Sequence, residues 1–192
     1  MDPIDGAKLA LRDQLITARG RIPLADLASR AHAVSDLLMT APEVRRAATV
    51  AAYVSVGREP GTGALLDALA AAGKRVILPL LQPDNDLDWA TYTGADALAA
   101  AGRGLLEPVT PALGPEAIAT ADVVIVPGLA VDATGLRLGR GGGSYDRALG
   151  RVPVGTFTCV VLNDEEVLES VPAAAHDRRV TAAVTEQRLL RF

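Results

Sequence analysis

Hydrophobic and polar positions follow two different spacings along the chain. Residues 5–19 and 23–39 place apolar side chains at helical intervals among polar ones, and Pro23 suits the first turn of a helix. From residue 49 onward, apolar runs of strand length alternate with helical stretches, one of which spans 63–72 and ends at Gly73. This order predicts an α/β fold with an open, mostly parallel sheet, flanked by helices in a Rossmann-like three-layer arrangement behind two N-terminal helices.

The predicted strands differ in how completely they are apolar. The run DVVIVP at 122–127 is apolar almost throughout, which is typical of a central parallel strand covered on both faces. An Ala-rich stretch that ends near Gly102 predicts a further helix, and residues 104–115 form a proline-punctuated connection. We predict strands at 49–56, 75–81, 88–93, 122–127, 154–162 and 179–185.

Length and composition place these elements in one domain. The chain has 192 residues, which is near the usual size of a single domain, so we predict one domain over 1–192. No apolar run approaches the length of a transmembrane helix, and Asp2 and Asp5 lie where a signal peptide would be basic. We therefore expect a cytoplasmic protein that does not bind membranes.

Charge and aromatic content limit the partners. The formal net charge of −4 gives no general attraction for nucleic acid, and one tryptophan, three tyrosines and two phenylalanines are too few for a base-stacking platform. The single cysteine, Cys159, lies in an apolar run and is expected to be buried, which excludes disulfides within the chain. We expect a monomer that acts on small molecules.

The segment RLGRGGGSYD, which begins at Arg137, is the most unusual stretch of the sequence. Its four glycines leave backbone amides free to approach phosphate oxygens, a helix is expected to begin near Ser144, and Arg137 and Arg140 can clamp an anion. The segment matches neither GxGxxG nor GxxxxGK[ST], so a flexible surface turn is the alternative. Asp146 suits a metal or phosphate site, but also suits the first turn of any helix.

Four further residues are candidates for binding ligands. Lys8 and Arg12 share a helix face and could reach one anion, although a single lysine on an N-terminal helix is usually a solvated side chain. Glu59 follows a predicted strand at the edge where open α/β sheets bind ligands, or is an exposed loop charge. Asp177 could supply the second carboxylate of a magnesium site, or form part of a turn.

Several of these segments together resemble one family. They are K-x-x-L-R from Lys8, the strand and loop containing Glu59, GKRVILP from residue 73, LLEP from 105, VPGLAVDATGLRLGRGGGSYDRAL from 126, and HD from 176 followed by RRV and TE. The chain resembles the 5-formyltetrahydrofolate cyclo-ligases over almost its whole length. The resemblance implies conversion of 5-formyltetrahydrofolate and ATP to 5,10-methenyltetrahydrofolate, ADP and phosphate with Mg²⁺, through phosphorylation of the formyl oxygen and attack by N10.

The resemblance also implies roles for individual residues. Arg140 stabilises the transferring phosphoryl group, with Lys8 as a second catalytic cation. The other implied roles are ATP binding by Lys8, Arg12, Arg137, Leu138, Gly139, Arg140, Gly141, Gly142, Gly143, Ser144 and Tyr145; folate binding by Val54, Glu59, Arg140, Gly141, Gly142, Gly143 and Ser144; and Mg²⁺ binding by Asp146 and Asp177.

Two positions depart from the family pattern. Ser144 stands where many members have tyrosine, and Thr181 stands where an acidic residue is usual. Two alternatives therefore remain open. One is an ATP-dependent enzyme on the same scaffold that acts on another formylated amine, and the other is a non-catalytic module that binds folate or nucleotide.

Overall fold

The structure is a computed structural model that describes residues 3–192. Its helices are α1 (Pro3–Gly20), α2 (Leu24–Thr40), α3 (Pro42–Arg46), α4 (Gly63–Ala71) and α5 (Ser144–Gly150), with 3₁₀ turns η1 (Ala95–Ala97), η2 (Gly102–Gly104), η3 (Pro115–Thr120) and η4 (Asp164–Glu166). Its strands are β1 (Thr49–Ala51), β2 (Arg75–Leu81), β3 (Leu87–Thr91), β4 (Leu98–Ala100), β5 (Leu106–Pro108), β6 (Val123–Pro127), β7 (Ala130–Asp132), β8 (Arg137–Leu138), β9 (Phe157–Val161), β10 (Val167–Leu168), β11 (Ala182–Val184) and β12 (Leu189–Arg191).

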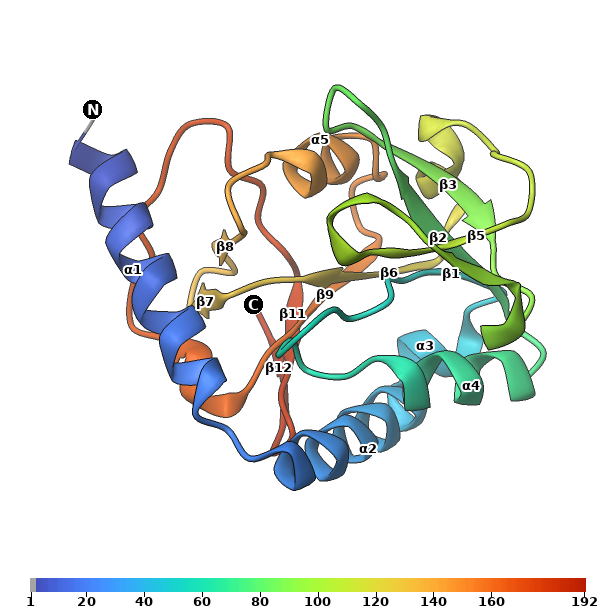
Figure 1. The fold of residues 1–192 in the computed structure, drawn as a ribbon, viewed down its shortest axis with the longest axis horizontal. Coiled ribbons are helices and arrows are strands. Elements are labelled where there is room, and N and C mark those ends of the chain that lie inside the picture. Colours follow the sequence, from blue (N-terminus) through green and yellow to red (C-terminus); the bar gives the residue numbers. More distant parts are fainter. Residues whose placement is uncertain (1–2) are drawn as a thin grey trace.

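A seven-stranded sheet forms the centre of the fold, in the order β12-β11-β9-β6-β1-β2-β3 (Figure 1). The five inner strands pair in parallel, and β12 and β3 close the two edges as antiparallel neighbours. This confirms the predicted open, mostly parallel sheet. Because the inner strands are parallel, their carboxyl ends meet at one edge, where ligands usually bind in such folds.

Alternate residues of the central strands pack on opposite faces of the sheet. Val50 and Ile125 lie in a core formed with α2, α3 and α4, whereas Ala51 and Val124 lie in a second core with α5 and η3. Helices therefore cover both faces (Figure 1), which explains why these strands are apolar throughout rather than alternating.

A smaller unit connects α1 to the main sheet. Strands β10, β7 and β8 form a three-stranded sheet, and Leu15 of α1 packs against Leu129 and Leu138 there. The sequence pattern did not predict this sheet, because strands of two or three residues are too short to show a period.

The predicted Ala-rich helix is wrong. Only Ala95–Ala97 forms a single 3₁₀ turn, and Leu98–Ala100 pairs antiparallel with Leu106–Pro108, inside the stretch expected to be a plain connection. Alanine favours helices, but the glycines at 94 and 102 leave too few residues for a helix that is stable by itself. In the hairpin, the backbone amides and carbonyls that a helix would have paired internally form hydrogen bonds between β4 and β5 instead.

Other boundaries differ from expectation by a few residues. The strand predicted at 49–56 ends at Ala51, and the one predicted at 154–162 begins at Phe157, after a turn in which Gly155 has a φ of +92°. Within residues 3–192, no helix combines the length and the apolar character needed to cross a membrane.

Candidate active site

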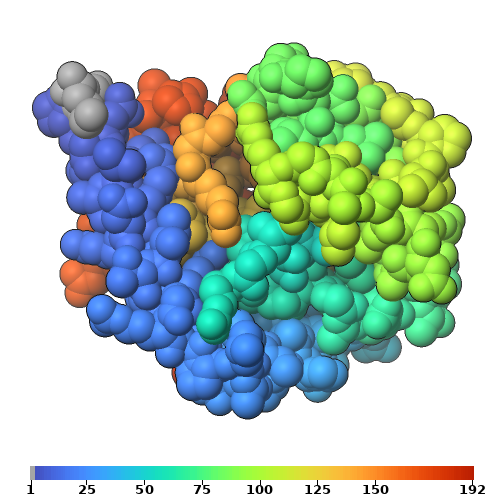
Figure 2. All heavy atoms as spheres, in the orientation of Figure 1, coloured from blue at the N-terminus to red at the C-terminus, as the bar shows by residue number. Residues whose placement is uncertain are grey.

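A cleft of about 360 Å³ lies at the carboxyl edge of the central sheet. Its walls are the loop after β1, the end of β6, the glycine-rich segment before α5, and the β4–β5 hairpin. Figure 2 shows the hollow between the orange glycine-rich segment and the yellow-green hairpin region. The residues that line it are Tyr53, Val54, Val56, Glu59, Pro79, Leu81, Leu87, Arg103, Leu105, Leu106, Glu107, Pro127, Gly128, Arg137, Gly139, Arg140, Gly141, Gly142, Gly143, Ser144, Tyr145 and Asp146.

Backbone conformation and close contacts explain why glycine occupies several positions of the glycine-rich segment. Gly141 and Gly143 have φ values of +100° and +70°, which residues with a Cβ rarely adopt. A Cβ on Gly139 would lie 2.8 Å from Nη1 of Arg137. The backbone therefore borders the cleft without side chains, and α5 begins at Ser144 as predicted.

Arg137 brings a buried positive charge to the cleft. Its side chain is almost fully covered, donates from Nη1 to the carbonyl of Pro127 (3.1 Å), and contacts Asp146 through Nη2 at 3.3 Å. Burial lowers the pKa of the guanidinium, and the charge of Asp146 opposes that shift. Nε is buried and has no hydrogen-bond partner within residues 3–192, so this arginine is held with one donor unsatisfied.

Glu59 and Arg140 form an ion pair across the cleft. Arg140 Nε lies 3.1 Å from Oε1 of Glu59, while Oε2 accepts a hydrogen bond from the backbone amide of Val56 at 2.9 Å. The Glu59 side chain is only 7% exposed, whereas that of Arg140 is 56% exposed. The carboxylate is thus fixed in place, and the arginine is the partner that can move.

Helix α1 supplies two cations beside the glycine-rich segment. Arg12 donates to the carbonyl of Gly139 (2.9 Å), and the buried Lys8 ammonium pairs with Asp177 at 2.5 Å. Burial acts to raise the pKa of Asp177, but the hydrogen bonds from Lys8 and from the Ala174 amide outweigh it, so the pKa is lowered. Lys8 and Asp177 neutralise each other in this arrangement.

The structure brings most of the predicted site residues together. Eleven of the cleft residues belong to the predicted set: Val54, Glu59, Arg137, Gly139, Arg140, Gly141, Gly142, Gly143, Ser144, Tyr145 and Asp146. Lys8, Arg12 and Asp177 do not line the cleft, and they contact its wall or each other instead. Leu138 also lies outside it, because its side chain packs in the core with Leu129.

The fit of a magnesium ion differs between the two predicted ligands. Oδ1 of Asp146 accepts hydrogen bonds from Arg137 and from the amide of Arg178, and the side chain still borders the cleft. Both oxygens of Asp177 are engaged by Lys8. No cluster of three or more metal-binding side chains occurs in residues 3–192. Since Mg²⁺ often uses one or two carboxylates together with phosphates, Asp146 fits, whereas Asp177 would have to release Lys8 first.

Sequence reasoning missed part of the cleft. Tyr53 and Gly128 follow the carboxyl ends of β1 and β6. Because ligands usually bind at that edge of an open sheet, the position of these two residues near the carboxyl ends of predicted strands could have suggested them. Arg103 and Leu106 belong to the hairpin that was predicted to be helix and connection. No pattern of apolar and polar residues in this part of the sequence predicts the β4–β5 hairpin.

These features define a class: an open-sheet α/β protein with a cleft, bordered by glycines and arginines, at the carboxyl edge of its parallel strands. The comparison with family models is more specific, since residues 4–186 match the 5-formyltetrahydrofolate cyclo-ligase family. The chain belongs to this family, which confirms the resemblance found in the sequence.

Individual relatives agree over most of the chain. A 5-formyltetrahydrofolate cyclo-ligase of Mycolicibacterium smegmatis is 41% identical over 95% of both chains, and one of Escherichia coli is 34% identical over 79% of this chain and 85% of the relative. The solved 5,10-methenyltetrahydrofolate synthetase of Aquifex aeolicus has a TM-score of 0.83 and 29% identity, covering 96% of this chain and 92% of that one. The Mycoplasma pneumoniae synthetase, at 17% identity and a TM-score of 0.73, shares the fold over 97% and 99% of the two chains.

Proposed function

We propose that the protein converts 5-formyltetrahydrofolate and ATP to 5,10-methenyltetrahydrofolate, ADP and phosphate. One observation carries the proposal beyond the family assignment. A single cleft combines a glycine-rich, arginine-flanked wall suited to phosphates with a fixed carboxylate, Glu59, suited to the N–H edge of a pterin. The two substrates could therefore meet within one site.

The proposed reaction has two chemical steps. The formyl oxygen attacks the γ-phosphorus, so that an O–P bond forms and ADP leaves. N10 then attacks the formyl carbon and loses its proton, while the C–O bond breaks and its electron pair departs with phosphate. No covalent link to the protein is required, so the chain contributes positioning and charge stabilisation.

The two cleft arginines suit different parts of this chemistry. Arg137 is buried and held by Pro127 and Asp146, so it serves as a fixed positive charge in the cleft wall that would face the phosphates. Arg140 is more exposed and paired with Glu59. When the pterin N–H groups occupy the Glu59 carboxylate, Arg140 is released toward the transferring phosphoryl group, where a positioned cation stabilises developing charge.

Asp146 would hold the magnesium ion, which neutralises phosphate charge when it is bound. The neighbouring Lys8–Asp177 pair and Arg12 fix α1 against the glycine-rich wall. We also propose a cytoplasmic monomer, in line with the sequence.

An absorbance assay tests this function. Purified protein with 5-formyltetrahydrofolate and Mg²⁺ should produce the near-ultraviolet absorbance of methenyltetrahydrofolate only when ATP is present. A rise without ATP would contradict the nucleotide requirement. No rise with this substrate, but ATP-dependent phosphate release with another formylated amine in a substrate panel, would favour the alternative enzyme and direct attention to Ser144. ATP and folate binding without any turnover would favour the non-catalytic module.

Replacing Glu59 with glutamine should impair folate use selectively. The change removes the charge that would accept the pterin N–H groups, so the KM for 5-formyltetrahydrofolate should rise about 10- to 100-fold, while the KM for ATP should not rise. Steady-state kinetics with each substrate varied in turn measures this. Glu107→Gln, which alters the other glutamate lining the cleft, is the control and should have a smaller effect. A defect confined to ATP would contradict the placement of Glu59.

Replacing Asp146 with asparagine should weaken the magnesium dependence of turnover. The apparent affinity for Mg²⁺ should fall at least about tenfold. The unfolding temperature should fall as well, because the buried Arg137 loses the carboxylate that balances its charge. Titration of activity with Mg²⁺ measures the effect. Asp177→Asn tests whether Asp177 binds Mg²⁺ or only pairs with Lys8. If Asp177 binds the ion, the substitution shifts the Mg²⁺ titration of activity. If it only pairs with Lys8, the substitution lowers the unfolding temperature and leaves the titration unchanged. Unchanged activity of Asp146→Asn at low Mg²⁺ would contradict the assignment.

A further inference from the structure

Three arginines line the cleft, and they differ in their partners. Arg137 pairs with Asp146, and Arg140 pairs with Glu59. Arg103 makes no ion pair with the residues that the structure describes, and its guanidinium donates from Nη1 to the neutral side-chain oxygen of Asn85 at 2.8 Å. Arg103 is therefore the one cleft arginine that forms no ion pair within residues 3–192, while the third cleft carboxylate, Glu107, accepts a hydrogen bond from the amide of Leu81 at 2.8 Å.

The backbone presents Arg103 at the mouth of the cleft. It lies at the tip of the β4–β5 hairpin, with a φ of +62° between Gly102 and Gly104, and it is exposed. Asn85, its partner, also accepts a hydrogen bond at its carbonyl from Arg147 (2.7 Å), which follows the glycine-rich segment. These contacts connect the hairpin tip, the turn before β3 and the segment on the opposite wall, so the guanidinium is held near the cleft before any ligand arrives.

The cleft that Arg103 shares with the glycine-rich wall is lined on the hairpin side mostly by apolar side chains, with Glu107 as the exception. Leu81, Leu87, Leu105 and Leu106 line it together with Pro79. In Figure 2 the yellow-green hairpin region forms the wall that faces the orange segment across the hollow. A ligand whose polar head lies at Glu59 would thus pass apolar side chains before it reaches the charge of Arg103.

5-Formyltetrahydrofolate has this order of chemical groups. Its pterin offers N–H donors, its benzoyl ring is apolar, and its far end carries the carboxylates of one or more glutamates. We propose that Arg103 is a specificity-determining residue that binds these carboxylates, and hence favours folates with an acidic tail. This inference rests on the proposed function for the placement of the pterin at Glu59. ATP is the less fitting source of the anion, because the free amides and the buried Arg137 that suit its phosphates lie on the opposite wall.

The test compares Arg103→Gln and Arg103→Lys with the unmodified protein. The KM for the monoglutamate should rise about five- to tenfold in Arg103→Gln, as expected for loss of one charged hydrogen bond at a partly exposed site, and the KM for ATP should stay the same. Arg103→Lys should recover part of the loss. Any preference of the unmodified protein for the pentaglutamate over the monoglutamate should shrink in Arg103→Gln. Arg46→Ala, an exposed arginine on α3 outside the cleft, should change neither constant.

Direct binding separates this inference from the proposed function. The Kd of 5-formyltetrahydrofolate, measured by calorimetry without ATP, should rise with the KM in Arg103→Gln, and the effect should diminish at high salt. An unchanged folate Kd, or a change in ATP affinity alone, overturns the role of Arg103. If the unmodified protein binds folate but never turns it over with ATP, the proposed function fails, and the Kd values still decide the role of Arg103.

Discussion

Replacing Arg140 with alanine should lower kcat about 10²- to 10³-fold. This is the loss expected when one preorganised charge that stabilises a transition state is removed. Arg140 qualifies because it lies on the cleft wall that suits phosphates, yet is paired with Glu59 rather than buried like Arg137. The measurement is the steady-state rate of methenyltetrahydrofolate formation with both substrates saturating.

The same substitution should not weaken folate binding. Arg140 pairs with the carboxylate oxygen that the pterin would need, so its removal leaves that oxygen of Glu59 without a partner, and the folate Kd should stay constant or fall. Arg188→Ala is a matched control, since Arg188 is 51% exposed and pairs with Asp164 away from the cleft. A large rise in folate Kd with little change in kcat would mean that Arg140 acts as a folate contact and not on the phosphoryl group.

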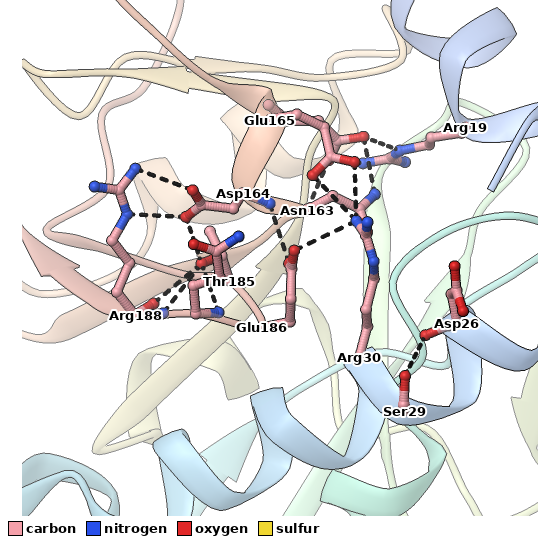
Figure 3. A network of polar contacts seen from close by, with 12 residues as sticks. Arg19, Asp26, Ser29, Arg30, Asn163, Asp164, Glu165, Thr185, Glu186 and Arg188 are labelled. Carbon is pink, nitrogen blue, oxygen red and sulfur yellow. Dashed lines mark hydrogen bonds and ion pairs between the residues drawn. The ribbon is translucent and has the colours of Figure 1, made fainter. Parts of the chain in front are cut away.

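Replacing Arg19 with methionine should destabilise the protein by about 3–5 kcal/mol. Arg19, from α1, donates from Nε and Nη2 to the two oxygens of Glu166 at 2.6 and 2.8 Å, and both side chains are almost completely buried. Figure 3 shows Arg19 beside the segment that contains Asn163 and Glu165. Removal of the arginine leaves Glu166 as a buried carboxylate without its counter-ion, which is the costly way to break such a pair. Urea unfolding measures the loss.

Two controls distinguish the buried charge from lost packing. Arg191→Met breaks an exposed pair with Glu43 and should cost less than about 1 kcal/mol. The double variant Arg19→Met with Glu166→Gln should regain part of the loss, because the uncompensated charge is gone. Equal destabilisation by the single and double variants would show that the effect comes from packing. Since Arg19 also donates to the carbonyl of Gly128, which lines the cleft, folate binding should weaken in the single variant as well.

The sequence predicted the parts of the fold that depend on local pattern. The run at 122–127 is apolar because helices cover both faces of β6, and that burial is visible in composition alone. The glycine-rich segment was recognisable for a similar reason, because the backbone there needs positive φ at Gly141 and Gly143.

Contacts between distant segments could not be predicted in this way. Lys8 was expected to bind ATP and Asp177 to bind magnesium, yet the two side chains, 169 positions apart, pair with each other. Their roles in ligand binding stay predictions. The β4–β5 hairpin was missed because its alanines favour a helix locally, while the pairing that decides its structure depends on Leu106–Pro108.

Isotope transfer from the formyl group tests the central claim most directly. The protein would be given ATP and 5-formyltetrahydrofolate labelled with ¹⁸O in the formyl group, and the released phosphate analysed by mass spectrometry. Phosphorylation of the formyl oxygen predicts that each phosphate carries one ¹⁸O atom, because the C–O bond breaks after the O–P bond has formed. Unlabelled phosphate, with the label released to water, would contradict the account.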